Sequence, residues 1–507
     1  MRFNTCFWEN AKRQQVIIPL WELQHGLCKE CSAFKQGVVL LLFYKRGCMK
    51  IKRLTSPLIL PVAGFAGAIL LGAMLLASSW CASGDPVPFV DALFISTSAV
   101  CVTGLASVDP SAVFNRTGHT VMLVLIQLGG LGITTYSTLI FYLFSRRISL
   151  SNKLVGEALL LDTSFHLGRF LQRVVTIVLL VEGAGAVMLY ILYRGGLDPF
   201  HAAFLAVSAF CNAGFVLWPD SLLRWEGVAG ANSIIMSLIV LGGLGFFVLD
   251  EVLRQAWGWM RTHVLRKRSP EALQKKLSYH ARLVIMTSIA LIVFGTAGIY
   301  FAELANPTWA STPGSSLGLT ALFHSVSSRT AGFATIDLVR YSDTSLLLIM
   351  LLMYIGGSPG SCAGGIKTTT FRALLGFIRA SVLGRSQVVV QGRALEPRTI
   401  NNTMVLLSYT AITFIIALAA LAFTENSGAP YGEGKVRVFD LLFEVFSAFG
   451  TVGLSLNVTP LLSEAGKLII CCVMFIGRIG PIWLISTVQQ FQHEPKYRLP
   501  QSDMPIG

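Results

Sequence analysis

The sequence predicts an all-α polytopic membrane protein, built from four pseudo-symmetric helix–pore loop–helix repeats around a central pore, with about eight transmembrane helices. Hydrophobic residues make up 53% of the 507 residues, charged residues make up 13%, and the mean hydropathy is +0.65. A soluble fold with so few charges cannot cover its surface with polar groups, whereas a lipid-facing surface needs this balance. Apolar stretches of roughly 20 residues also recur along the chain, which argues against a large soluble domain.

The repeats are visible in a short glycine pattern that occurs four times. Its copies read Val-Cys-Val-Thr-Gly-Leu, Phe-Cys-Asn-Ala-Gly-Phe, Ser-Arg-Thr-Ala-Gly-Phe and Phe-Gly-Thr-Val-Gly-Leu. The central glycines are Gly104, Gly214, Gly332 and Gly453, at intervals of 110, 118 and 121 residues. Such intervals are too long for a solenoid and fit two membrane helices with a re-entrant segment between them. We therefore expect pore repeats at 49–147, 148–268, 269–392 and 393–507, the last with a cytoplasmic tail.

Each repeat is predicted to begin with an apolar span, at 57–79, 174–193, 283–301 and 404–423. A stretch of about a dozen apolar residues follows, which at about 1.5 Å per residue cannot cross a hydrocarbon core of about 30 Å. These stretches, at 89–100, 200–210, 318–328 and 439–449, are predicted to be half-membrane helices that dip in and return. A second span ends each repeat, at 121–144, 233–252, 345–380 with an interruption, and 468–487.

The basic residues predict the orientation of the chain. Eight crossings leave both termini on one side, and lysines and arginines gather before the first span and between the repeats. By the positive-inside rule these segments are cytoplasmic, so we expect both termini in the cytoplasm, a plasma (inner) membrane location and glycine patterns that open outward. The same loops account for the net charge of +14, so membrane lipid is the expected contact and a nucleic-acid partner is not expected.

The glycine patterns predict an ion filter. Backbone that is not helical inside a bilayer must line a watery cavity or be buried in protein, because orphan carbonyl groups are costly there. Glycine lets such a chain turn its carbonyls toward an axis, and a ring of carbonyls replaces the hydration shell of an alkali cation. Close helix packing is the alternative role for a membrane glycine. The candidate filter residues, with K⁺ at the glycines, are Thr103, Gly104, Ala213, Gly214, Ala331, Gly332, Val452 and Gly453.

A run of glycines, serines and one proline interrupts the third repeat at 356–366. Such a run cannot hold a helix, so the span is predicted to break at mid-membrane depth, where a flexible loop is suited to block and release ions. A packing kink at Pro359 is the alternative. The run also has half of a phosphate-loop pattern, but Ile366 intervenes before Lys367 and no strand precedes it, so we expect no nucleotide there. The candidate gate residues of this loop are Gly357, Ser358, Pro359, Gly360, Ser361, Cys362, Ala363, Gly364 and Gly365.

Arg478 is a charge at the centre of the predicted span 468–487. At that depth an arginine must face the pore or a carbonyl group rather than lipid. We expect it either to raise the barrier for cations beneath the filter or to anchor the gate loop through hydrogen bonds. Glu182 and Glu444 are intramembrane acids with either local hydrogen-bonding or ion-pathway roles. The repeated Leu-Gly-Gly-Leu-Gly at 128–132 and 241–245 is interpreted as a helix-packing motif.

These patterns, together with the run at 356–370 and Gly477-Arg478-Ile479-Gly480-Pro481, resemble the Ktr/Trk superfamily of potassium-translocating membrane subunits. Thr451-Val452-Gly453 also matches the start of a potassium-channel filter. The resemblance covers about 54–490 and is closest to the Ktr (KtrB-like) type, because eight spans are expected, whereas the Trk type carries two further N-terminal spans. It implies a filter with one glycine from each repeat, a gate beneath it, and sodium-stimulated potassium uptake. It also implies a homodimer on a cytosolic nucleotide-binding RCK-type ring (KtrA/TrkA-like). Cys362 departs from the Ser or Thr usual at that gate position in the family.

Residues 1–48 differ from the rest of the chain. They hold Cys28-x-x-Cys31 near His25, which lacks a clear fourth metal ligand, and an apolar stretch at 38–44 that is too short to span. Met49 is followed at once by Lys50-Ile51-Lys52-Arg53 and the first span. We therefore expect 1–48 to be an N-terminal extension from a mis-annotated start.

Two classes of function fit the sequence. The first is a gated, channel-like potassium pore driven by the membrane potential, and the second is an alternating-access Na⁺/K⁺ or H⁺/K⁺ symporter. Four repeats that run in the same direction favour the channel-like pore, since inverted repeats are typical of alternating-access symporters. An enzyme and a bound cofactor are not expected, because no carboxylate pair, metal cluster or nucleophile with its base falls where membrane geometry would bring it together.

Overall fold

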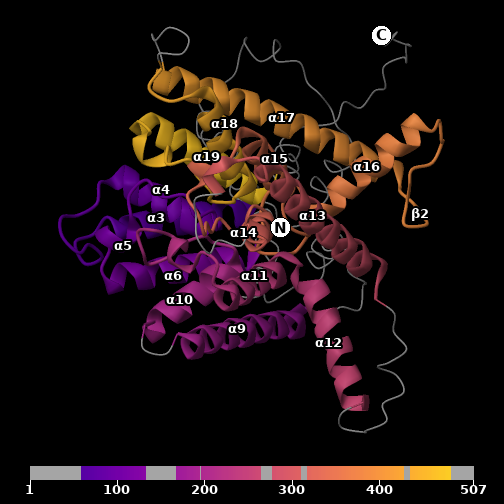
Figure 1. Ribbon diagram of the computed structural model, residues 1–507, viewed down its shortest axis with the longest axis horizontal. Helices are drawn as coiled ribbons and strands as arrows, with labels where there is room; N and C mark the ends of the chain where they lie inside the picture. The colour runs from indigo at the N-terminus through magenta and orange to yellow at the C-terminus, as the bar shows by residue number, and fades with distance from the viewer. Residues whose placement is uncertain are drawn as a thin grey trace, which may run out of the picture. The chain divides into compact units, whose positions relative to one another are not determined.

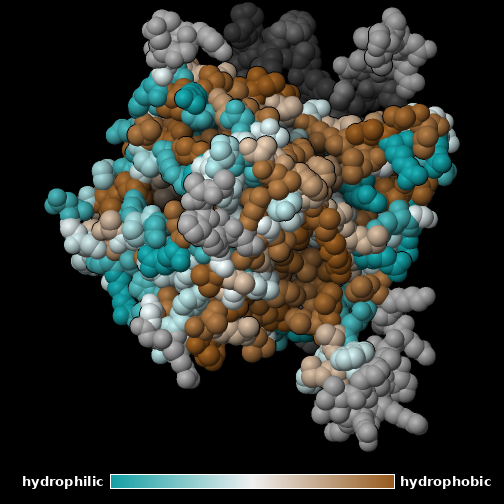
Figure 2. All heavy atoms as spheres, viewed as in Figure 1, coloured by the Kyte–Doolittle hydropathy of each residue, from teal (hydrophilic) through white to brown (hydrophobic). Residues whose placement is uncertain are grey.

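The computed structural model describes residues 59–132, 167–193, 196–263, 277–309, 317–426 and 434–480, and these are mainly helical (Figure 1). The N-terminal extension, Met49, the C-terminal tail and the ends of the predicted spans 121–144 and 468–487 lie outside the described residues. Within those ranges, three helices are each long and apolar enough to cross a membrane, and a fourth span results if one bent pair is joined. Figure 2 shows broad apolar areas on the viewed face, as lipid contact requires.

The first span of each predicted repeat is a helix. These helices are α3 (Ile59–Leu76), α9 (Leu167–Leu192), α13 (Tyr279–Glu303) and α17 (Pro397–Asn426). Large apolar side chains on them are exposed, among them Phe294, Ile415 and Phe423. In a membrane protein such side chains contact lipid.

The short apolar stretches form short, largely buried helices, namely α4 (Phe89–Cys101), α10 (Pro199–Cys211), α14 (Leu317–Ser327) and α18 (Val438–Gly450). Each of these helices buries a phenylalanine near its middle, and the four are Phe94, Phe204, Phe323 and Phe443. Each helix packs against the long helix that precedes it, so the core of the protein lies around the short helices.

The second spans differ most from prediction. They contain α6 (Arg116–Gly130), α11 (Ala229–Gly243), α12 (Phe246–His263), α15 (Asp343–Tyr354), α16 (Thr368–Val382) and α19 (Glu464–Ile479). The interruption expected in 345–380 is present between Tyr354 and Thr368. The span expected at 233–252 is not one continuous helix, because α11 and α12 form a pair bent by 114°. Gly245 has a φ of +89° there, a left-handed conformation that ends a helix.

Short elements complete the described chain. They are α5 (Pro110–Val113), the 3₁₀ turns η2 (Leu223–Trp225), η3 (Pro307–Trp309), η4 (Leu338–Arg340) and η5 (Thr459–Leu461), and the antiparallel hairpin of β1 (Val389–Val390) and β2 (Arg393–Ala394). Val389 pairs with Ala394 and Val390 with Arg393.

The helices pack in a closed order. The helix that follows each glycine pattern contacts the short helix of the next predicted repeat: α6 contacts α10, α11 contacts α14, α15 contacts α18, and α19 contacts α4. The last of these contacts joins the fourth predicted repeat to the first. It includes an ion pair between Lys467 Nζ and Asp91 Oδ1 at 2.6 Å, with both side chains only 13% exposed.

We expect Lys467→Met to destabilise the protein by about 3–5 kcal/mol, because it leaves the Asp91 carboxylate buried without its partner. Thermal unfolding in detergent measures this as a lower melting temperature. The double variant Asp91→Asn with Lys467→Met removes both charges and should recover much of the loss. A single variant that melts with the parent would contradict a closing role for this pair.

Candidate functional site

The four pattern glycines lie in a ring. All have positive φ: +95° at Gly104, +69° at Gly214, +76° at Gly332 and +97° at Gly453. A Cβ on Gly104 would lie 2.6 Å from the carbonyl oxygen of Ala213, and one on Gly214 would lie 2.8 Å from that of Ala331. A Cβ on Gly332 would meet the Val452 carbonyl, and one on Gly453 the Thr103 carbonyl. The structure therefore brings all eight candidate filter residues together, in the order of the chain, and side chains have no room there.

The turn into each glycine has the same cause. Val102, Asn212 and Thr451 are left-handed C-caps of α4, α10 and α18, and Thr330 has a φ of +88° after α14. A left-handed residue ends a helix and turns the chain away from the helix axis. The backbone after each short helix is thus turned into the ring two residues before its glycine.

Four buried serines on the short helices hold the glycine loops: Ser98, Ser208, Ser327 and Ser447. The amides of Gly104 and Gly453 each donate to the hydroxyl of the corresponding serine at 3.0 Å. The hydroxyls of Ser208 and Ser327 donate to the carbonyls of Phe215 and Phe333 at 2.7 and 2.6 Å. Sequence reasoning missed these residues, although aligning the four copies places a serine five or six positions before every glycine.

A cavity of about 410 Å³ lies on the ring and is lined by all four pattern glycines. Three carboxylates also line it, Asp109, Asp220 and Asp337, one after each of the first three patterns, while Asn457 follows the fourth. Arg224 Nη2 donates to Asp220 at 2.9 Å and lowers the pKa of that carboxyl, which keeps it ionised. These carboxylates place negative charge beside the ring, and the sequence analysis singled out none of them.

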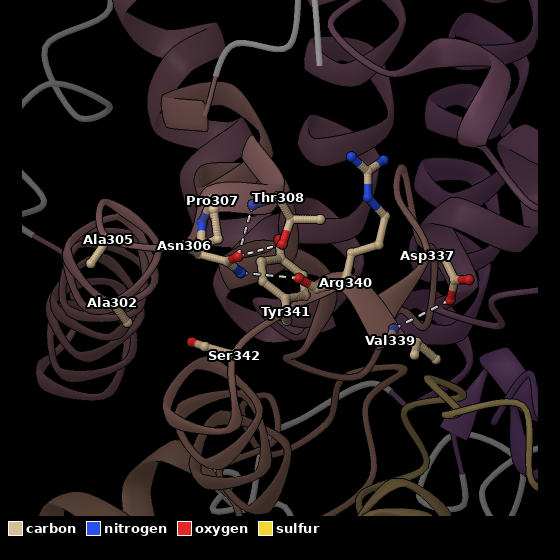
Figure 3. A pocket seen from close by; sticks show the side chains of 10 residues that line it. All are labelled: Ala302, Ala305, Asn306, Pro307, Thr308, Asp337, Val339, Arg340, Tyr341 and Ser342. Atoms are coloured by element: carbon tan, nitrogen blue, oxygen red, sulfur yellow. Dashed lines mark hydrogen bonds between the residues drawn. The ribbon is translucent and has the colours of Figure 1, made fainter. Parts of the chain in front are cut away.

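A second cavity, of about 620 Å³, lies away from the ring, between the end of α13 and the start of α15 (Figure 3). Asn306 spans it, accepting from the Thr308 amide at 3.1 Å and donating to the Arg340 carbonyl at 3.1 Å. Glu303 next to it accepts from Trp309 Nε1 at 2.7 Å and from the Ser342 amide at 3.0 Å. These polar groups satisfy one another and brace α13 against α15.

The candidate gate loop (residues 356–366, the gate loop) forms a tight turn between α15 and α16. The Gly356 amide donates to the Ile366 carbonyl at 2.9 Å, and the Thr368 amide donates to the Gly357 carbonyl at 3.1 Å. A Cβ on Gly364 would lie 2.7 Å from Cγ2 of Thr451, the residue two positions before the filter glycine Gly453. The loop therefore lies directly against the turn that leads into the fourth pattern glycine.

Arg478 reaches two backbone carbonyls. Its Nη1 donates to Cys362 of the loop, and its Nη2 donates to Gly129 of α6. The side chain is buried, and its Nε has no partner among the described residues. The position fits the expected anchoring contact, because the guanidinium joins the loop to α6.

Two further cations at the loop were missed from the sequence. Arg329, just after α14, has Nη2 3.4 Å from the Gly356 carbonyl and 3.4 Å from the Ser288 hydroxyl. Lys367 Nζ donates to the Ala363 carbonyl at 2.6 Å. Arg329 stands inside the third glycine pattern, where the other copies carry cysteine or glycine, and that difference was the available signal.

The two intramembrane acids make local hydrogen bonds. Glu182 accepts from Gln127 Nε2 at 3.2 Å, and Cys211 Sγ lies 3.6 Å from its other oxygen. Glu444 accepts from the hydroxyls of Ser455 and Thr459, the latter at 2.9 Å. Glu182 of α9 thus links to α6 and α10, and Glu444 links α18 to the segment that follows the fourth glycine pattern. Within the described ranges, no group of three or more His, Cys, Asp or Glu is placed to hold a metal ion.

The long apolar helices and the buried short helices define an all-α membrane protein. The family model for TrkH, described as a cation transport protein, matches residues 68–493, and the chain belongs to this family. The resemblance to the Ktr/Trk superfamily is thereby confirmed.

Named relatives agree with this assignment. The chain is 33% identical over 470 residues to the potassium/sodium uptake protein NtpJ of Enterococcus hirae, covering 90% of this chain and 99% of that one. It is 34% identical over 432 residues to the Ktr system potassium uptake protein B of Vibrio alginolyticus, covering 83% and 88%. The crystal structure of the potassium transporter TrkH from Vibrio parahaemolyticus matches with a TM-score of 0.64 at 18% identity, over 85% of each chain.

Proposed function

We propose that this chain is the membrane subunit of a potassium uptake system and that K⁺ passes through the ring of Gly104, Gly214, Gly332 and Gly453. The observation that carries the proposal is the closed order of the ring, in which each glycine abuts the carbonyl of the next copy. Carbonyls of Thr103, Ala213, Ala331 and Val452 would then replace the ion's hydration shell. Four pseudo-symmetric repeats, about eight spans and cytoplasmic termini in the plasma membrane complete the proposed architecture.

The proposed driving force is the membrane potential, which supplies about 2.3 kcal/mol per charge for each 100 mV. Below the ring, the loop at 356–366 acts as the gate, and Arg478 holds it or raises the cation barrier. The carboxylates beside the ring raise the local concentration of cations at the entrance. The closed order of helix contacts, in which the helix after each glycine pattern packs on the short helix of the next repeat, favours this gated pore over an alternating-access Na⁺/K⁺ or H⁺/K⁺ symporter.

The proposed partners are a second copy of the chain and a cytosolic nucleotide-binding RCK-type ring. Two relatives are named as proteins of a Ktr system, a name that supports an assembly of several components. Sodium is proposed as a stimulating ion, because one relative is named a potassium/sodium uptake protein. K⁺ is the transported ion in this proposal, and the protein needs no cofactor.

Rubidium uptake tests the proposal. The full chain, expressed with its cytosolic partner in a strain that lacks potassium uptake, is expected to restore growth at low potassium and saturable Rb⁺ uptake. K⁺ should compete with Rb⁺ far better than Na⁺ does. Membrane-inserted protein that moves neither ion in the presence of the partner would refute the assignment.

A further inference from the structure

The gate loop is hydrogen-bonded into the break between α11 and α12. The Ser358 amide donates to the Gly243 carbonyl at 3.1 Å, and the Cys362 amide donates to the Gly242 carbonyl at 3.3 Å. The Ser358 hydroxyl also donates to the carbonyls of Gly243 and Leu244. The last carbonyls of a helix have no partner within the helix, so the end of α11 offers acceptors and the loop supplies the donors.

The loop also supplies an acceptor to the start of α12. The Phe246 amide donates to the Gly360 carbonyl at 3.0 Å. The first amides of a helix likewise lack internal partners. One segment of the third predicted repeat therefore satisfies both ends of a broken helix in the second.

The two copies of Leu-Gly-Gly-Leu-Gly serve this contact and not helix packing alone. The first glycines, Gly129 and Gly242, abut the carbonyls of Val100 and Phe210 at the ends of α4 and α10. The last glycines face the gate loop. A Cβ on Gly245 would lie 2.8 Å from the Pro359 carbonyl oxygen.

The last glycine of the first copy has the same relation to the loop. Gly132 has a φ of +74°, and a Cβ on it would lie 3.2 Å from the Ser361 carbonyl oxygen. Within four residues, each motif thus reaches from the end of a short helix to the gate loop. Together the last glycines form a seat for the loop, which we call the glycine seat (Gly132 and Gly245).

Beyond the break, α12 contacts α13 and α9 through its first turns, and its far end projects away from the other labelled helices (Figure 1). Glu251 on α12 accepts from the Ser278 amide at 2.6 Å and from its hydroxyl at 2.7 Å, at the start of α13. Asp250 lies 3.6 Å from Arg173 of α9 and pairs with Arg254. These contacts fix the position of α12 relative to two long helices.

We propose that α12 is a lever for the gate, with Gly245 as the positioning residue through which its motion reaches the loop. The inference rests on the proposed function and deepens it by naming how the gate is regulated. A rotation of α12 about the break moves the Phe246 amide relative to the Gly243 and Leu244 carbonyls at the end of α11. The loop then cannot keep its hydrogen bonds to both helices, and it leaves the ring. Two discrete hydrogen-bonded arrangements of one element are the physical requirement for such coupling.

The test is Rb⁺ uptake by the full chain with its cytosolic partner, comparing Gly245→Ala with the parent. An alanine at this left-handed position is strained, and its Cβ meets Pro359 and Ser358, so the loop is pushed from its seat. We expect the maximal uptake rate to rise by about two- to thirtyfold, the range of such couplings, with the preference for K⁺ over Na⁺ unchanged. The matched control is Gly384→Ala, which has a φ of +60° and no described atom within 4 Å of a Cβ.

Two milder variants keep the inference testable if Gly245→Ala fails to insert. Ser358→Ala removes the hydroxyl bonds to the break, and Glu251→Gln weakens the contact of α12 with Ser278. Both should change the maximal rate and leave the apparent KM and the ion preference intact. A parent that moves Rb⁺ while every variant moves it at the parent's rate would overturn the lever. A parent that moves no Rb⁺ would instead overturn the proposed function.

Discussion

Gly453→Ser is expected to lower Rb⁺ uptake by more than about tenfold and to weaken the preference for K⁺ over Na⁺ in what remains. Gly453 has a φ of +97°, which costs a residue with a side chain about 1–2 kcal/mol. The greater effect is steric. A Cβ would lie 3.0 Å from Cα of Gly104 and closer still to the Thr103 carbonyl oxygen, so that carbonyl must turn from its place in the ring.

The control separates strain from the ring contact. Gly384→Ser places the same side chain at a φ of +60° with no described atom within 4 Å of its Cβ, so it carries the conformational cost alone. Competition of Na⁺ with Rb⁺ uptake measures the preference, and surface labelling measures the amount inserted. Parent-like uptake and selectivity from inserted Gly453→Ser protein would contradict the filter.

Local patterns predicted the elements of the ring well. The stretch expected at 89–100 is the helix Phe89–Cys101, and that expected at 439–449 is Val438–Gly450. Both the apolar length and the glycine pattern that follows it are local properties of the chain, so one sequence suffices to find them. The candidate filter residues followed for the same reason, since the four copies share one offset to the glycine.

What the sequence did not reveal depends on contacts between distant residues. Ser358 and Gly243 are 115 positions apart, and Asp91 and Lys467 are 376 apart. The hydropathy of 233–252 gave no sign of the bend, because Leu-Gly-Gly-Leu-Gly also fits a straight helix with a small-residue face. The helix breaks at this motif, between α11 and α12, because the gate loop satisfies the backbone groups that the break exposes.

Arg478→Gln is expected to raise the maximal rate of Rb⁺ uptake, by about tenfold, if the guanidinium holds the gate loop. The change removes hydrogen bonds to the carbonyls of Cys362 and Gly129, and each carbonyl left buried without a partner costs about 1–3 kcal/mol. The substitution therefore destabilises the closed arrangement of the loop, in which both carbonyls are buried. It does not destabilise an open arrangement, in which water binds both carbonyls. The fraction of molecules with an open gate loop therefore grows.

Arg478→Lys separates the two roles that the sequence leaves open. Lysine keeps the positive charge but not the planar fork that reaches two carbonyls at once. If Arg478 anchors the loop, the lysine variant should also conduct faster than the parent. If the charge itself limits cation passage, the lysine variant should remain slow while the glutamine variant is fast. Arg379→Gln on the exposed side of α16 is the matched control. Slower uptake from both inserted Arg478 variants would contradict either role, because each predicts that neutralising this charge increases flux.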